Sequence, residues 1–298
     1  MKTELKDLLR PEILHTVDGL ELVARIVVEG FMSGSNQSQT IGSGQEFSQY
    51  RSYEPGDDLR QLDWKMYARS ERFYIKQAEI ETNITVKFII DASESMSYGE
   101  KSLTKLDYAK VMTAALAYLA RKQSDTFGLY AVNDTALRVV HPRFEQQHYM
   151  RFLYELVSLN AEGSWSKSAS LETLFDRHGK EMIIFFSDLY DEKNDLFEFI
   201  SSLKTTRNEV IVFHLMGNEE MTLGFNGSFT FEDMESGAHL KADTALQQAP
   251  YVERVQKWIQ RSRLWMLEKQ ISYHLVMLND SFEKVLRDFL KVRKSIAR

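Results

Sequence analysis

Three short, almost continuously apolar stretches constrain the fold of this chain more than any other feature. They are VKFIID (86–91), EMIIFFSD (181–188) and EVIVFHLM (209–216). Such runs are typical of parallel strands that are buried on both faces. The segments between them space their apolar residues as helices do, for example KLDYAKVMTAALAYLARKQ (105–123). This alternation predicts an α/β fold, with a mostly parallel sheet and helices on both of its faces.

The remaining segments fit around this core in a simple order. Apolar residues recur at three- and four-residue steps over residues 1–30, which predicts helix. The stretch GFNGSFTFEDMESGAHLKAD (224–243) predicts a hairpin-like insertion near residues 218–245. We therefore expect an N-terminal helical and irregular segment, 1–82, packed on an α/β domain that spans residues 83–298.

Composition excludes several classes of function. The chain has 298 residues and no cysteine, which excludes disulfides, thiolate metal sites and cysteine nucleophiles. The formal net charge is −6, and Lys and Arg are spread along the chain, which does not favour nucleic-acid binding. The N-terminus lacks the apolar core of a signal peptide, and no apolar run reaches the roughly 20 residues of a membrane span. We expect a cytoplasmic protein without a membrane span.

Polar residues follow two of the predicted strands at the point where each strand ends. Asp91, Ser93 and Ser95 form a D-x-S-x-S pattern after the first strand, and Asp188 ends the second. In open α/β sheets, ligands bind at the carboxyl ends of the strands, where loops converge. One carboxylate and two hydroxyls are hard oxygen ligands, which suit Mg²⁺ or Mn²⁺. The pattern therefore predicts a metal site with Asp188 beside it.

A simpler interpretation of the same residues is a helix cap. An Asp or Ser before a helix commonly accepts hydrogen bonds from the first backbone N–H groups of that helix. For any single residue of the pattern the cap is the better interpretation. The combination of D-x-S-x-S after one buried strand and Ser-Asp after another favours the metal site.

Two motifs carry a resemblance to known families. DASES (91–95) with FFSD (185–188) resembles the metal-ion-dependent adhesion site of von Willebrand factor A-like domains. Upstream, GSGQEFSQYRSYEPGDDLRQLDW (42–64) is similar to the signature of the domain of unknown function 58 family. The resemblance implies a three-layer von Willebrand factor A-like fold.

The resemblance also implies a third metal ligand, normally a Thr in a loop. The corresponding loop here, AEGSWSKSASLETLF (161–175), has no Thr before its helical residues. Ser164, Ser166 and Ser168 are the candidates to replace it, and we prefer Ser164, which follows Gly163.

The upstream signature contains many charged and aromatic residues within a short span, and we expect them to form one network. They are Arg51, Tyr53, Asp57, Asp58, Arg60, Asp63, Trp64 and Arg69. Such a network can fasten the N-terminal segment to the sheet, with Trp64 packed on the main domain. Alternatively, it forms a docking surface for a partner.

The resemblance implies protein binding rather than catalysis. In that mechanism Asp91, Ser93, Ser95 and a loop Ser hold the metal, Asp188 acts directly or through water, and a carboxylate from a partner protein completes the shell. The site can then be empty in the absence of a partner. The resemblance further implies a functional link to bacterial MoxR-type AAA+ ATPases, in the chaperone-like assembly or maturation of protein complexes.

An enzyme of the haloacid-dehalogenase phosphatase type is the alternative function. There Asp91 would be the nucleophile, and Asp188 and Asp191 would hold magnesium. That chemistry also needs a carboxylic acid two residues after the nucleophile to protonate the leaving group. Position 93 is Ser, which cannot supply that proton near neutral pH. We therefore expect no enzymatic activity.

Overall fold

The structure is a computed structural model, and it describes most of the chain. The described residues are 5–35, 49–53, 64–77, 84–134, 137–145, 147–165, 180–190, 195–225 and 227–296. The chain forms two compact units. The larger unit comprises Met1–Ser38 and Ile84–Arg298, and the smaller one comprises Gln39–Asn83.

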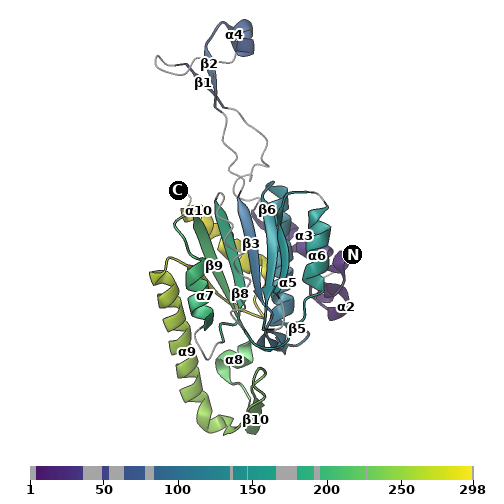
Figure 1. Ribbon diagram of the computed structural model, residues 1–298, viewed down its shortest axis with the longest axis vertical. Helices are drawn as coiled ribbons and strands as arrows, with labels where there is room; N and C mark the ends of the chain where they lie inside the picture. The colour runs from purple at the N-terminus through teal and green to yellow at the C-terminus, as the bar shows by residue number, and fades with distance from the viewer. Residues whose placement is uncertain are drawn as a thin grey trace. The chain divides into compact units, whose positions relative to one another are not determined.

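A six-stranded sheet forms the middle of the larger unit (Figure 1). Its strand order is β12-β9-β8-β3-β6-β7, and every neighbouring pair is parallel except β6 and β7. The strands are β3 (Thr85–Asp91), β6 (Thr126–Val132), β7 (Leu137–Arg143), β8 (Glu181–Ser187), β9 (Asn208–Met216) and β12 (Ser272–Met277). The chain runs from β3 to one side, into β6, and later returns to the other side of β3 with β8. The point at which the strand order reverses therefore lies between β3 and β8.

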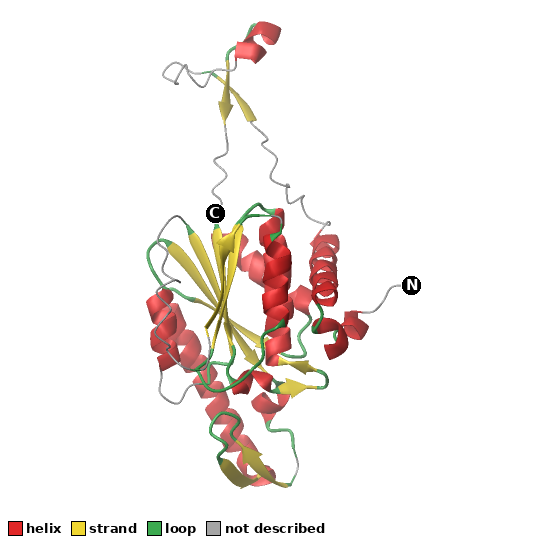
Figure 2. Ribbon diagram, turned by 45° about the vertical axis from the view of Figure 1, so that its right-hand side comes forward, coloured by secondary structure: helices red, strands yellow, loops and turns green. Residues whose placement is uncertain are grey.

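Helices cover both faces of this sheet, as Figure 2 shows. Alternate residues of β3 enter different cores: Phe88 and Ile90 lie in one, and Ile89 lies in the other. The first core is closed by α5 (Lys105–Lys122), α6 (His148–Val157) and α10 (Phe282–Ile296). The second is closed by α7 (Asp195–Leu203) and α9 (Thr244–Glu268). The predicted three-layer α/β fold, with a mostly parallel sheet, is confirmed.

The N-terminal helices belong to the larger unit, which differs from the expected boundary after residue 82. These helices are α1 (Leu5–Leu8), α2 (Pro11–Leu14) and α3 (Val17–Ser35). The third of them packs against α5, α6 and α10. Its residues Leu20, Val23 and Val27 are fully buried in the first core. The apolar stripe that predicted a helix thus completes the core of the α/β domain.

The expected hairpin-like insertion is present after β9. It begins with the short helix α8 (Asn218–Thr222) and continues into the antiparallel pair β10 (Ser228–Glu232) and β11 (His239–Asp243). Three further short elements follow β3 in the chain. They are the 3₁₀ helix η2 (Glu94–Ser97) and the antiparallel pair β4 (Gly99–Glu100) and β5 (Leu103–Thr104).

The smaller unit contains the antiparallel strands β1 (Gln49–Ser52) and β2 (Tyr74–Gln77) and the helix α4 (Trp64–Ser70). Within it, Tyr67 stacks on Phe73, and Trp64 contacts Tyr67 edge-on while 62% of Trp64 remains exposed. Four of the expected network residues, Asp57, Asp58, Arg60 and Asp63, lie outside the described residues. The ion-pair network predicted for this segment therefore stays a prediction.

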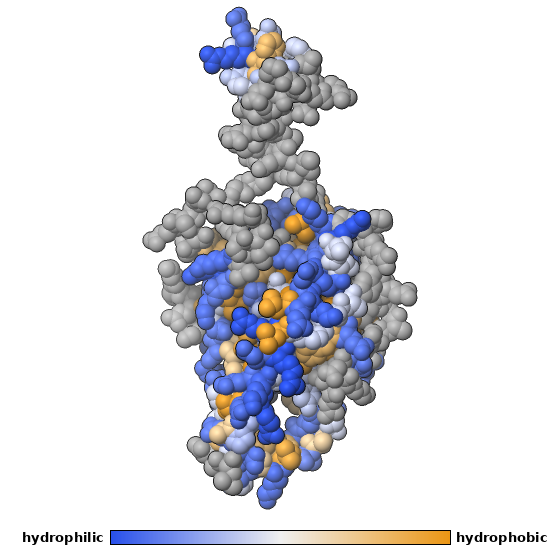
Figure 3. Space-filling view, turned by 90° about the vertical axis from the view of Figure 1, so that its left-hand side faces the viewer, coloured by the Kyte–Doolittle hydropathy of each residue, from blue (hydrophilic) through white to orange (hydrophobic). Residues whose placement is uncertain are grey.

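The surface of the larger unit on the side of α9 is mostly hydrophilic, with a few apolar side chains among the polar ones (Figure 3). Leu264 and Leu267 of α9 are among the exposed apolar residues. None of the helices within the described ranges combines the length and the apolar character that crossing a bilayer requires.

Candidate metal site

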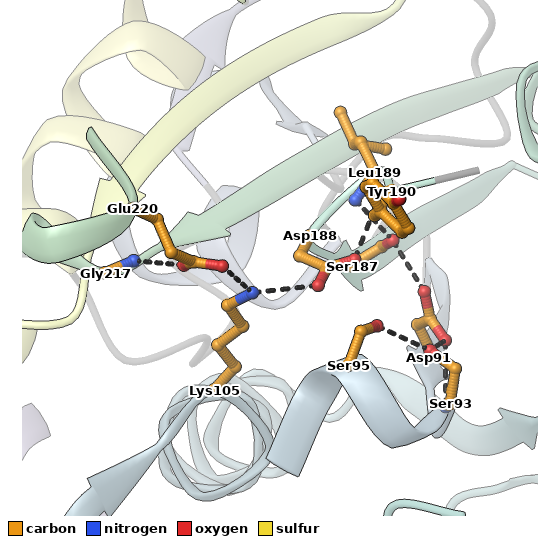
Figure 4. Close-up of polar contacts among 10 residues, drawn as sticks. All are labelled: Asp91, Ser93, Ser95, Lys105, Ser187, Asp188, Leu189, Tyr190, Gly217 and Glu220. Carbon is orange, nitrogen blue, oxygen red and sulfur yellow. Dashed lines mark hydrogen bonds and ion pairs between the residues drawn. The ribbon is translucent and has the colours of Figure 1, made fainter. Parts of the chain in front are cut away.

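The predicted residues Asp91, Ser93 and Ser95 come together at the carboxyl end of β3 (Figure 4). Asp91 is the last residue of the strand and is fully buried. Its Oδ1 accepts hydrogen bonds from the backbone N–H of Ser93 (3.1 Å) and from the Ser93 hydroxyl (2.7 Å). The Ser93 and Ser95 hydroxyl oxygens are 3.1 Å apart. The three side chains thus form one compact group of oxygen atoms.

The helix-cap interpretation does not hold for the side chain of Ser93. Ser93 occupies the N-cap position of η2, yet its side chain makes no capping hydrogen bond to that helix. The hydroxyl donates to Asp91 instead. A cap would direct the serine oxygen to a backbone N–H group. The Ser93 hydroxyl therefore hydrogen-bonds the Asp91 carboxylate and does not cap the helix.

Backbone hydrogen bonds from two neighbouring segments hold the turn that carries these residues. The N–H of Ala92 donates to the carbonyl of Val132 at the end of β6 (2.9 Å). The N–H of Glu94 donates to the carbonyl of Gly163 (2.8 Å), and Glu162 donates to Ala92 (2.9 Å). The turn is therefore fixed between β6 and the loop that contains Ser164.

Ser164 lies on this loop, but its hydroxyl does not join the Asp91 group. It donates to Oδ2 of Asp134, at 3.1 Å. Gly163 adopts a left-handed backbone (φ 68°), and a Cβ there would lie 2.0 Å from Oδ1 of Asp134. Ser166 and Ser168, the other candidates for the third ligand, lie outside the described residues.

The loop after β8 brings a second set of polar groups to the same place. The hydroxyl of Ser187 donates to Oδ2 of Asp91 (2.7 Å), so both oxygens of that carboxylate accept hydroxyl hydrogen bonds. Asp188, 5% exposed, follows directly. Leu189 has a left-handed backbone (φ 58°), which leucine rarely adopts. The strand β8 thus places Ser187 and Asp188 beside β3, at the point where the strand order reverses, which is where open α/β sheets bind ligands.

A buried lysine completes the group, and sequence reasoning missed it. Lys105 is 2% exposed, and its Nζ donates to Oδ2 of Asp188 (2.8 Å) and to Oε1 of Glu220 (2.7 Å). Burial alone would lower the pKa of Lys105, but the two carboxylates raise it above the ordinary value. Glu220, from α8, also accepts a hydrogen bond from the N–H of Gly217 (2.7 Å).

The charges in this group are not balanced. Asp91, Asp188 and Glu220 are three carboxyl groups, and Lys105 is the ammonium that the structure places among them. Burial, together with the charge of Asp188, raises the pKa of Asp91 to about 7. Burial would also raise the pKa of Asp188, but Lys105 holds it below the ordinary value. A further cation near Asp91 would relieve this imbalance.

Asp91, Ser93 and Ser95 offer carboxylate and hydroxyl oxygens, which are the ligands that small hard cations such as Mg²⁺ prefer. Two ligands at right angles around Mg²⁺, with bonds of about 2.1 Å, are about 3.0 Å apart. The Ser93 and Ser95 oxygens are 3.1 Å apart. Within the described ranges, no three His, Asp or Glu side chains form a metal-binding group by themselves. A cation at this site would therefore depend on the serine hydroxyls as well as on Asp91.

Comparison with known families identifies the chain. The family model described as protein of unknown function DUF58 matches residues 49–259, well over half of the chain. The chain belongs to the DUF58 family. The family predicted from the signature upstream of β3 is thus confirmed.

Curated relatives of this DUF58 protein are uncharacterised. Proteins from Mycobacterium bovis and Mycobacterium tuberculosis are 24% identical to it over 234 residues, which cover 76% of this chain and 72% of theirs.

Among solved structures, the chain is similar to the hypothetical protein BatB from Bacteroides thetaiotaomicron. The two share 12% identity at a TM-score of 0.44, over 72% of this chain and all of BatB (100%). It is also similar to the VWA domain of SpRpn10, with 13% identity and a TM-score of 0.40, over 68% of this chain and 94% of that one.

Proposed function

We propose that this DUF58 protein is a metal-dependent protein-binding module and not an enzyme. The observation that carries the proposal is the convergence of Asp91, Ser93, Ser95 and Ser187 where the strand order reverses. Asp91, Ser93 and Ser95 would hold Mg²⁺ or Mn²⁺, with Asp188 nearby. The cation, when bound, supplies a positive centre for a carboxylate of the partner protein. Ser164 remains a proposed third ligand and would have to leave Asp134 to bind.

Serines rather than carboxylates suit this role for an electrostatic reason. Neutral hydroxyl ligands leave a divalent cation with net positive charge, whereas additional carboxylates would neutralise it. A cation with residual charge attracts an external carboxylate strongly in a partly buried site. The hydroxyls of Ser93 and Ser187 also donate to Asp91, so they orient that carboxylate in the absence of the partner.

The residues disfavour the phosphatase alternative. That mechanism would use Asp91 as the nucleophile and would need a carboxyl group two residues later to protonate the leaving group. The residue two positions later is Ser93, which lacks the acidity of a carboxyl group. Asp191, the other magnesium ligand of that mechanism, lies outside the described residues.

The partner that we propose is a MoxR-type AAA+ ATPase in the cytoplasm, which follows from the family resemblance. In that arrangement the ATPase provides the energy, and this chain provides the metal-dependent contact during assembly or maturation of protein complexes.

Binding of the purified full chain to a purified MoxR-type ATPase from the same organism tests the proposal. Nucleotide is left out, because the ATPase uses Mg²⁺ for its own substrate. We expect binding with Mg²⁺, no binding in EDTA, and no binding by Asp91→Ala in Mg²⁺. The variant Asp18→Ala removes an exposed carboxylate of α3 and should bind like the wild type. Binding that is unaffected by EDTA and by Asp91→Ala would contradict the proposal.

A further inference from the structure

The turn between β10 and β11 reaches the loop that carries Asp188. In both Figure 1 and Figure 2 the hairpin lies beyond one end of the sheet. The hydroxyl of Tyr190, two residues after Asp188, donates to Oδ2 of Asp233 at 3.2 Å. Tyr190 also donates its backbone N–H to Oδ1 of Asp188 (3.1 Å). One residue thus joins the hairpin turn to the candidate metal site.

This turn, residues 233–237, is held in shape by its own hydrogen bonds. Oδ1 of Asp233 accepts bonds from the backbone N–H (2.7 Å) and the hydroxyl (2.6 Å) of Ser236. The N–H of Gly237 donates to the carbonyl of Asp233 (2.8 Å), and Gly237 has the left-handed backbone (φ 68°) that favours glycine. The backbone around Glu235, which lies within this turn, is therefore held in a defined conformation.

The carboxyl group of Glu235 lies next to the hydroxyls of Ser95 and Ser93, which would bind the cation. Its Oε1 is buried and has no hydrogen-bond partner among the described residues. A buried carboxylate oxygen without a donor is costly, unless a ligand satisfies it.

We infer that Glu235 is a further ligand of this metal site, contributed by the chain itself at the place where a partner's carboxylate would bind. The inference rests on the proposed function, since it needs a cation at Asp91, Ser93 and Ser95. A partner then competes with Glu235 for the same coordination position.

Mn²⁺ titration of the full chain, followed by electron paramagnetic resonance, tests this assignment. We compare the wild type with Glu235→Gln, Glu235→Asp and Asp91→Asn. Glu235→Asp keeps the negative charge but shortens the side chain, so it separates a direct ligand from a distant charge. Glu232→Gln, an exposed residue of the same hairpin, is the matched control. Hydrogen exchange of the amides of residues 233–237, with and without Mg²⁺, is the second measurement.

We expect both Glu235 variants to bind Mn²⁺ at least about tenfold more weakly than the wild type, as is typical when a group close to a metal is removed. Mg²⁺ should slow exchange at residues 233–237 in the wild type and in Glu232→Gln, but not in either Glu235 variant. If Glu235→Asp binds Mn²⁺ like the wild type while Asp91→Asn does not, the assignment of Glu235 is wrong and the proposed metal site stands. If the wild type binds no Mn²⁺, the proposed function fails, and this inference with it.

Discussion

At the scale of single residues, the carboxyl group of Asp91 lies in surroundings that strongly disfavour its charged form. It is fully buried beside Asp188, and burial and that neighbouring charge raise its pKa from 3.8 to about 7. Residues of this kind cluster at functional sites, because function requires an arrangement that stability alone would not select. Lys105 stabilises Asp188 but makes no hydrogen bond to Asp91 in the described structure.

A pH dependence of stability follows for the metal-free protein. In the unfolded chain Asp91 loses its proton near pH 3.8, whereas in the folded protein it keeps it up to about pH 7. The folded state therefore binds more protons between these values, so the contribution of Asp91 to the free energy of unfolding falls as pH rises through this window and is constant above it.

Urea unfolding in EDTA at several pH values checks this prediction. Subtracting the profile of Asp91→Asn from that of the wild type removes the titration of groups that do not interact with Asp91. Relative to Asp91→Asn, the free energy of unfolding of the wild type should fall as the pH rises from about 4 to about 7. A flat difference across this window would show that Asp91 has an ordinary pKa.

The sequence contained enough information to locate half of this site. Asp91, Ser93, Ser95 and Asp188 follow strands whose ends must meet in a parallel sheet, so their convergence could be predicted. Lys105 could not be predicted, because a lysine in the first turn of a helix is usually exposed. Glu220 and Glu235 reach the site only through the course of the insertion after β9, which no local pattern specifies. Ser164 follows Gly163 on a loop that holds the turn after Asp91, but its hydroxyl donates to Asp134, which the sequence did not indicate.

At the scale of secondary-structure elements, α3 is part of the main core and not an attachment to it. Its spacing of apolar residues predicted a helix, but spacing does not say which surface the helix covers. The domain boundary expected after residue 82 differs from the structure for this reason. The buried face of α3 lies against α5, α6 and α10, which come from three distant parts of the chain.

The variant Leu20→Ala tests this arrangement. Leu20 is fully buried, so we expect the free energy of unfolding to fall by about 2–5 kcal/mol. Because α3 shares the core of the sheet, the transitions followed by far-ultraviolet and near-ultraviolet circular dichroism should shift together. The exposed Arg25 of the same helix is the control, and Arg25→Ala should change stability by no more than about 0.5 kcal/mol. A separate, earlier transition of the N-terminal region alone would contradict the shared core.

At the scale of the whole molecule, the division into two units suggests a separation of roles. The described residues of the two hydrophobic cores all come from the larger unit. The signature residues Arg51, Tyr53, Trp64 and Arg69 belong to the smaller one. The sheet and the candidate metal site therefore lie in one unit, and the family signature lies largely in the other.

Replacing Gln39–Asn83 by a flexible Gly-Ser linker tests this separation. We expect the shortened protein to unfold at the same urea concentration as the full chain and to bind Mn²⁺ with unchanged affinity. If the signature is a docking surface, the shortened protein will lose binding to the MoxR-type ATPase while its metal affinity is retained. A loss of cooperative unfolding would instead show that the signature fastens the structure together.

The packing of α3 against α10 also has a consequence for how the protein is made. About 250 residues separate the two helices, and a ribosome that adds 5–20 residues per second needs on the order of 10–50 s to synthesise them. During that time the apolar face of α3 leaves the ribosome without one of its final partners. The core can therefore close fully only after α10 has been made, and until then the part of α3 that α10 covers is open to aggregation and to chaperones.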